Sequence, residues 1–76
     1  NGAEIDLVLE LAPSKLWAIE IKASHVPKLE RGFYAACQDL PFVEKFVVYA
    51  GNDEFPLKDD ITVTSLAGIL HRVGQL

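Results

Sequence analysis

The sequence predicts an α/β domain in which a mixed β-sheet begins with an antiparallel hairpin and is flanked by helices. Apolar residues alternate with a period of two near the N-terminus, as in half-buried strands, and change to helical spacing after residue 27. Of the 76 residues, 50% are hydrophobic and 24% are charged, which is a globular composition sufficient for one small domain. We therefore expect residues 1–76 to form a single domain.

The first two expected elements are strands at residues 3–11 and 15–23, joined by a turn at residues 12–14. Their register follows from burial, because a slip of one residue would turn every apolar side chain to the opposite face. The selected register pairs Ile5 with Ile21, Leu7 with Ile19, Leu9 with Trp17 and Leu11 with Lys15 on an apolar face. On the other face, which is expected to be exposed to solvent, it pairs Glu4 with Lys22, Asp6 with Glu20, and Val8 with Ala18.

The next predicted helix covers residues 27–40, where Pro27 suits the first turn and Pro41 ends the helix. Residues 44–50 are rich in β-branched and aromatic side chains, which favours a central strand covered on both faces.

A loop is expected at residues 51–56, followed by a short strand at residues 61–64. Ser65 is expected to cap a final helix over residues 65–74, with one apolar side. That side consists of Leu66, Ile69, Leu70 and Val73. The aromatic residues Trp17, Phe33, Phe46 and Tyr49 are assigned to the core, together with a buried and inert Cys37.

The net charge, apolar runs and cysteine content of the sequence limit the partners and the cellular location that we expect. The formal net charge of −4 disfavours nucleic-acid binding by the chain alone, so a polyanion would require local basic groups, a metal ion or another domain. No apolar run is long enough to cross a bilayer, no signal peptide is visible, and the single cysteine favours a reducing cytoplasm. The chain starts Asn-Gly and contains no methionine, so we expect a piece of a longer protein.

The selected register places the carboxylates of Asp6 and Glu20 opposite each other, with Lys22 on the same face. Like charges that face each other across strands are destabilising unless a cation lies between them. Lys22 is one candidate for that cation, and a divalent metal such as Mg²⁺ is the other.

Asp6 followed by Glu20-Ile21-Lys22 resembles the D…(D/E)-x-K motif of the PD-(D/E)XK phosphodiesterase superfamily. The resemblance implies a restriction-endonuclease-like fold in which Asp6, Glu20 and the Ile21 carbonyl bind Mg²⁺ or Mn²⁺. It implies that Lys22 orients or activates water and stabilises charge in the transition state.

A longer resemblance covers Gly2 to Glu10, Trp17 to Ser24, Pro27, Gly32-Phe33 and Val48 to Gly51. These residues are similar to an uncharacterised domain at the C-terminus of prokaryotic AAA+ ATPases. The resemblance implies an upstream ATPase domain as a partner, which would be the only route to ATP, since no P-loop motif occurs in this sequence.

The sequence departs from the superfamily pattern in two places. Ile5 stands where the named proline would be, and the helix that usually opens the fold has no counterpart. The missing helix would leave one face of the sheet uncovered unless a removed segment or a partner supplies it. An oligomer is one possibility.

Four further residues are candidate substrate or supporting contacts: Glu4, Lys28, Arg31 and Gln38. For Glu4 an ion pair with Lys22 is the favoured explanation, and a solvated helix face explains Lys28, Arg31 and Gln38 about as well.

Three functions follow as hypotheses. The first is a metal-dependent nuclease-like module of an AAA+ ATPase. The second is a non-catalytic module of the same fold that docks DNA or protein and regulates the ATPase. The third is an unrelated small α/β interaction domain with a solvated charged face.

Overall fold

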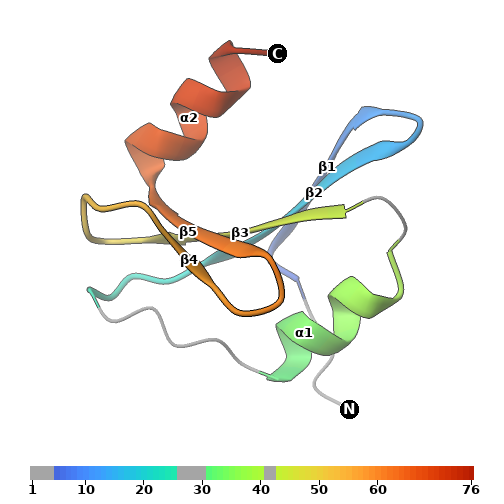
Figure 1. The fold of residues 1–76 in the computed structure, drawn as a ribbon, viewed down its shortest axis with the longest axis horizontal. Coiled ribbons are helices and arrows are strands. Elements are labelled where there is room, and N and C mark those ends of the chain that lie inside the picture. The colour runs from blue at the N-terminus through green and yellow to red at the C-terminus, as the bar shows by residue number, and fades with distance from the viewer. Residues whose placement is uncertain (1–4, 26–30, 41–42) are drawn as a thin grey trace.

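A computed structural model describes residues 5–25, 31–40 and 43–76 as a five-stranded mixed sheet with two helices. Figure 1 shows the sheet with α1 and α2 on its opposite sides. The strand order is β1-β2-β3-β5-β4. The elements are β1 (Leu7–Ala12), β2 (Lys15–Ile21), α1 (Arg31–Gln38), β3 (Val43–Tyr49), β4 (Phe55–Leu57), β5 (Ile61–Ser65) and α2 (Leu66–Gly74). The predicted α/β class and mixed sheet are confirmed.

The β1–β2 hairpin has the predicted register over most of its length, with Leu7 opposite Ile19 and Leu9 opposite Trp17. The prediction is wrong at the turn, because Lys15 pairs with Ala12 and not with Leu11. The strands are therefore joined by the two residues 13–14, and the register shifts between residues 10 and 12. Two-residue connections are the commonest in hairpins, and the extra residue is taken up as an irregularity in the strand.

The open end of the hairpin also differs from the prediction. Strand β1 begins at Leu7, and the chain bends at Asp6. Ile5 consequently packs against the core on the α1 side and does not lie opposite Ile21. The reason is a side-chain bond, since the Asp6 carboxylate accepts from the Ile21 backbone N–H and replaces the next bond of the ladder. Residues 3 and 4 of the predicted strand lie outside the described residues.

The centre of the sheet is parallel, with β3 between β2 and β5. Strand β4 pairs antiparallel with β5 at the edge, with Pro56 opposite Thr62. The sequence prediction missed β4, because it assigned residues 51–56 to a loop. Proline is accepted in an edge strand, where its missing N–H can face away from the ladder.

Both predicted helices exist where the structure describes them. Helix α1 ends at Gln38, before the predicted end, because Asp39 and Leu40 form a turn. Residues 27–30 of the predicted helix lie outside the described part of the chain. Helix α2 begins after Ser65, whose Oγ accepts a 3.0 Å hydrogen bond from the Gly68 N–H. The predicted serine cap is thus confirmed.

Each face of the sheet has its own core. On the α1 side Phe33 and Cys37 pack on the inner strands, and on the α2 side Ile69 packs over Trp17 and Phe46. The aromatic residues and the cysteine predicted to be core are all buried. The predicted apolar side of α2 is different, because Ile69 alone of its four residues is buried. Leu66, Leu70 and Val73 remain exposed.

Within the described residues, neither helix has the length and apolar character that crossing a bilayer requires.

Candidate functional site

Glu20 lies in a position that a carboxylate rarely occupies. It is the sixth residue of β2, only 5% exposed, on the sheet face that Ala18 and α1 share. Phe33 and Cys37 of α1 belong to the same buried cluster as Ala18, so the helix packs on this side of the sheet. The prediction that Glu20 lies on a face exposed to solvent is therefore wrong, because Glu20 is buried on the side of the sheet where α1 packs. A buried carboxylate is costly unless it is paired, so its surroundings are informative.

Asp6 is the first partner of Glu20. The Asp6 Oδ2 accepts a 2.8 Å hydrogen bond from the Ile21 N–H, and the Asp6 carboxyl also hydrogen-bonds the Glu20 side chain. The pKa of Asp6 is lowered from its usual value, chiefly by the Ile21 bond, then by the Glu20 bond, and last by the Lys22 charge. The predicted meeting of Asp6 and Glu20 occurs, but through side chains at the end of the ladder and not as a strand pair.

Lys22 supplies the positive charge of the group. Its Nζ lies 4.0 Å from Glu20 Oε2, which is the outer limit of an ion pair. The Lys22 backbone N–H donates to the Val48 carbonyl at 2.8 Å, so the residue is held against β3 just beyond the end of β2. Asp6, Glu20 and Lys22, the three predicted catalytic residues, are thus brought together, and we call them the carboxylate–lysine cluster.

The chemistry of the cluster suits a hard cation better than a soft one, because its side-chain ligands are oxygens. A divalent cation between two neighbouring carboxylates would offset the repulsion between their negative charges. In the described part of the chain, no three His, Cys, Asp or Glu side chains gather closely enough to hold a metal by themselves. A cation here would need Asp6, Glu20, the Ile21 carbonyl and oxygens from water or substrate.

The other predicted contacts do not join the cluster. Glu4 and Lys28 lie outside the described residues, as does the side chain of Arg31. Gln38 is exposed and lines a cavity of about 200 Å³ with Tyr34, Lys45 and Asp59. None of the three cluster residues lines that cavity.

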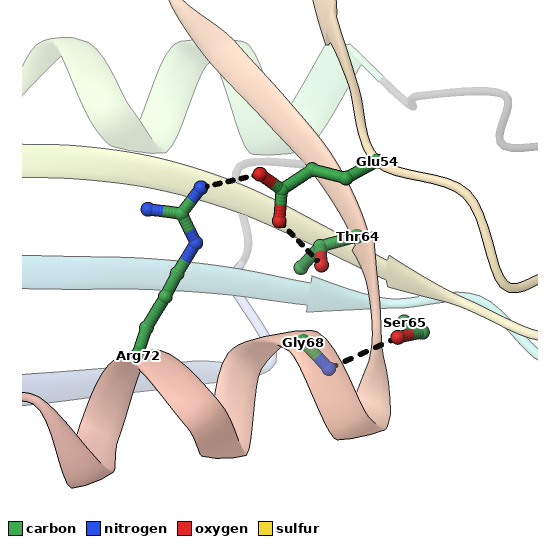
Figure 2. Close-up of polar contacts among 5 residues, drawn as sticks. All are labelled: Glu54, Thr64, Ser65, Gly68 and Arg72. Atoms are coloured by element: carbon green, nitrogen blue, oxygen red, sulfur yellow. Dashed lines mark hydrogen bonds and ion pairs between the residues drawn. The ribbon is translucent and has the colours of Figure 1, made fainter.

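A second polar group was not predicted from the sequence (Figure 2). Glu54 accepts a 2.9 Å hydrogen bond from the buried Thr64 hydroxyl and a 2.8 Å bond from the Arg72 guanidinium. The Thr64 bond is the main cause of a lowered pKa for Glu54, and Arg72 adds to it. These contacts join the loop before β4 to β5 and α2, so they hold the sheet edge to the helix. No periodicity could have revealed them, because the partners lie 10 and 18 residues apart.

Comparison with known proteins gives a family and distant relatives. Residues 1–69 match the family described as a domain of unknown function, DUF4143. Two similar proteins are Uncharacterized protein Mb2031c of Mycobacterium bovis and Uncharacterized protein Rv2008c of Mycobacterium tuberculosis. Each is 34% identical over 70 residues, which are 92% of this chain but 16% of the relative. The chain thus spans about a sixth of the length of these relatives. No solved structure matches.

Proposed function

We propose that this chain, which belongs to the DUF4143 family of domains of unknown function, is a divalent-metal-dependent, nuclease-like module that acts on phosphodiester bonds. The observation that supports the proposal is the buried Glu20 carboxyl in contact with Asp6, beside the Lys22 ammonium. A carboxylate that served only the fold could be replaced here by an apolar residue like its neighbour Ala18. Its place in the sheet therefore favours a chemical role.

Asp6 and Glu20 are the proposed metal ligands, with the Ile21 carbonyl as a third. A bound Mg²⁺ or Mn²⁺ would supply charge stabilisation to the phosphoryl group and would lower the pKa of a coordinated water. Asp6 is suited to its role because its Oδ2 accepts from the Ile21 N–H, which fixes the carboxylate beside Glu20. Glu20 is held by the central strands, so both ligands are positioned by rigid parts of the fold.

Lys22 is the proposed electrostatic residue. Its ammonium, 4.0 Å from Glu20, is placed to position water and to balance negative charge that develops on a phosphate. The chain has few other means of attracting nucleic acid, since its net charge is −4. DNA or RNA binding would therefore depend on the metal and on basic residues supplied from elsewhere.

The proposal also includes a PD-(D/E)XK-type fold and a place in a larger AAA+ ATPase protein of the cytoplasm. The sequence resemblance and the shortness of the match relative to the mycobacterial proteins support that architecture. ATP would then act only through a separate domain.

A second function is favoured by one observation. Only 7% of the Glu20 side chain is accessible, so a substrate would have little direct access to that ligand. The alternative is a catalytically inactive module of the same fold that docks DNA or protein and regulates the ATPase. In that case the cluster would be a structural polar group, with Glu20 buried, that fixes the end of the hairpin.

The test is metal-dependent cleavage by the purified protein. We expect Mn²⁺ to bind, as measured by calorimetry, and single- or double-stranded DNA or RNA to be cleaved only when Mg²⁺ or Mn²⁺ is present. Lys22→Ala should abolish cleavage and leave Mn²⁺ affinity within about tenfold, since the ammonium is not a ligand. Glu20→Gln should weaken Mn²⁺ binding itself.

The matched control is Lys15→Ala, which removes a lysine from the exposed other end of β2 and should change neither property. Absence of cleavage of every substrate by a protein that binds Mn²⁺ would favour the inactive module. Absence of Mn²⁺ binding as well would remove the metal-site proposal.

A further inference from the structure

The chain just beyond β2 is held by two backbone hydrogen bonds to the end of β3. The Lys22 N–H donates to the Val48 carbonyl at 2.8 Å, and the Ala50 N–H donates to the Ser24 carbonyl at 2.9 Å. Because β2 and β3 are parallel, both segments leave the sheet at the same end (Figure 1). The position of Lys22 therefore depends on how the end of β3 presents its peptide groups.

The second of these bonds departs from the regular ladder. In the register of β2 and β3, a continued parallel pairing would direct the Ala50 N–H to the carbonyl of Lys22. The Ala50 N–H donates instead to Ser24, two residues further on, and the chain bends there. Ladder irregularities such as bulges re-aim side chains next to active sites. The residue within this irregularity is Lys22, whose Nζ lies 4.0 Å from Glu20 Oε2.

The loop that follows Ala50 is wrapped around the ring of Tyr49. The Asp53 N–H donates to the Tyr49 hydroxyl at 3.0 Å. A Cβ added to Gly51 would lie 2.5 Å from Cζ and 2.6 Å from the hydroxyl oxygen of the same ring, which is closer than any side chain tolerates. A glycine at this position thus allows the backbone to lie directly against the ring.

The Tyr49 ring is a rigid support for this loop. It is buried in the core cluster on the α1 side, and it makes an edge contact with the Phe55 ring at 5.9 Å between centroids. The Tyr49 backbone lies in β3, opposite Ser65 of β5. Because the ring is packed on these sides, a methyl group added at Gly51 would displace the loop, and the peptide group of Ala50 with it.

We propose that Tyr49 and Gly51 are positioning residues for Lys22. Their contact fixes the Ala50 N–H, and that N–H holds the Ser24 carbonyl. The resulting bend keeps the lysine ammonium beside the buried carboxylate of the cluster. The two residues act through the backbone and not by contact with substrate. The inference rests on the proposed function, since this position matters to cleavage only if the ammonium takes part in it.

The test uses a natural full-length protein that carries this domain, with the variants Gly51→Ala and Tyr49→Phe. The first variant pushes the loop away from the ring, and the second keeps the ring but removes the acceptor for the Asp53 N–H. The matched control is Asn52→Ala, which changes an exposed side chain of the same loop. Circular dichroism confirms that each variant is folded.

The first readout is the geometry of Lys22, which needs no activity. The lysines are reductively methylated with isotope-labelled formaldehyde, and the NMR signal of Lys22 is identified by its absence in Lys22→Arg. In the parent and in Asn52→Ala, the substitution Glu20→Gln should shift this signal, because the carboxylate lies 4.0 Å from the ammonium. In Gly51→Ala and Tyr49→Phe, Glu20→Gln should shift the signal by less than half as much.

The second readout separates turnover from binding. We expect Gly51→Ala to lower kcat at least about tenfold and Tyr49→Phe at least about threefold, while KM and the affinity for Mn²⁺ stay within about threefold of the parent values. A variant that only loosened the fold would lose Mn²⁺ affinity as well, because the proposed ligands would no longer be held in place.

Three outcomes would overturn the inference. The first is an undiminished NMR shift in both variants, and the second is a diminished shift with an unchanged kcat in a parent protein that cleaves. The third is the absence of any shift in the parent, since the ammonium would then not be held beside Glu20. If the parent cleaves no nucleic acid, the proposed function fails, and the NMR shift alone decides whether Tyr49 and Gly51 position Lys22. If Gly51→Ala does not fold, Tyr49→Phe decides.

Discussion

Gly68 is a glycine inside a helix where a larger residue should be harmful. Replacing an interior helical glycine by alanine normally stabilises a protein by roughly 0.5–1 kcal/mol. At Gly68, however, an added Cβ would lie 2.0 Å from the Oγ1 of Thr64, a residue that is 1% exposed and bonded to Glu54 (Figure 2). The helix or the strand must therefore shift.

The expected magnitude follows from these contacts. Overpacking of a core costs about 1–3 kcal/mol, and displacing the Thr64 hydroxyl loses a hydrogen bond of about 1 kcal/mol. Set against the usual gain, Gly68→Ala should lower the free energy of unfolding by about 1–3 kcal/mol. For a domain of this size, each kcal/mol lowers the melting temperature by roughly 4–8 °C.

Urea unfolding followed by circular dichroism measures the effect, and the chain supplies its own control. Gly74 is the last residue of α2 and has nothing within 4 Å of an added Cβ, so Gly74→Ala should be neutral or mildly stabilising. In a Thr64→Ala background the nearest remaining contacts of the Gly68→Ala methyl are 3.3 and 3.4 Å, which are tolerable. The effect of Gly68→Ala and Thr64→Ala together on the free energy of unfolding should therefore differ from the sum of their separate effects by at least about 1 kcal/mol. If Gly68→Ala alone stabilises the protein as Gly74→Ala does, the packing of α2 on Thr64 is not as described.

Two further predictions concern stability. The pKa of Asp6 is lowered in the folded protein, so its contribution is complete at neutral pH and is lost as the pH falls through that lowered pKa, below about 4. The protein should therefore lose less of its free energy of unfolding between pH 7 and pH 3 when Asp6 is replaced in Asp6→Asn. The control Asp39→Asn, in the exposed turn after α1, should not reduce this loss. An unchanged loss in Asp6→Asn would contradict the role of the Ile21 bond. Asp59 and Asp60 have φ angles of 61° and 59°, so Asp60→Gly should raise the free energy of unfolding by roughly 0.5–1 kcal/mol. Asp53 is a loop residue whose φ is not positive, so the control Asp53→Gly should lower the free energy of unfolding. Thermal melts of the two variants measure both effects, and a lowered melting temperature for Asp60→Gly would contradict the prediction.

The sequence predicted what depends on local pattern. The pairing of Leu7 with Ile19 could be predicted because a slip of one residue would turn the apolar side chains of a strand to the opposite face, and the Ser65 cap could be predicted because it is a local bond. The register and the cap each involve residues whose relation is fixed by strand or helix geometry. The predicted meeting of Asp6 with Glu20 also occurs, although through side chains beyond the start of β1 and not as a strand pair.

The features that were missed depend on contacts between distant parts of the chain. Glu20 is buried on the side of the sheet where α1 packs, and the period of β2 does not reveal that this face is covered. Strand β4 contains Pro56 among loop-forming residues, so its pairing with β5 is visible only in three dimensions. The exposed stripe that includes Leu70 has the same spacing as a buried one, and only the position of α2 distinguishes them.

The strand order has a consequence for how this protein folds. The outer pairs, β1 with β2 and β4 with β5, are hairpins between neighbouring segments, and they can form early because short loops close quickly. Strand β3 then inserts between them and makes both parallel pairings at once, over long loops. Among the described strands only β3 joins the two ribbons, so we expect its docking to limit the rate of folding. Conservative truncations at Val47, at the centre of β3, should accordingly slow refolding more than they accelerate unfolding.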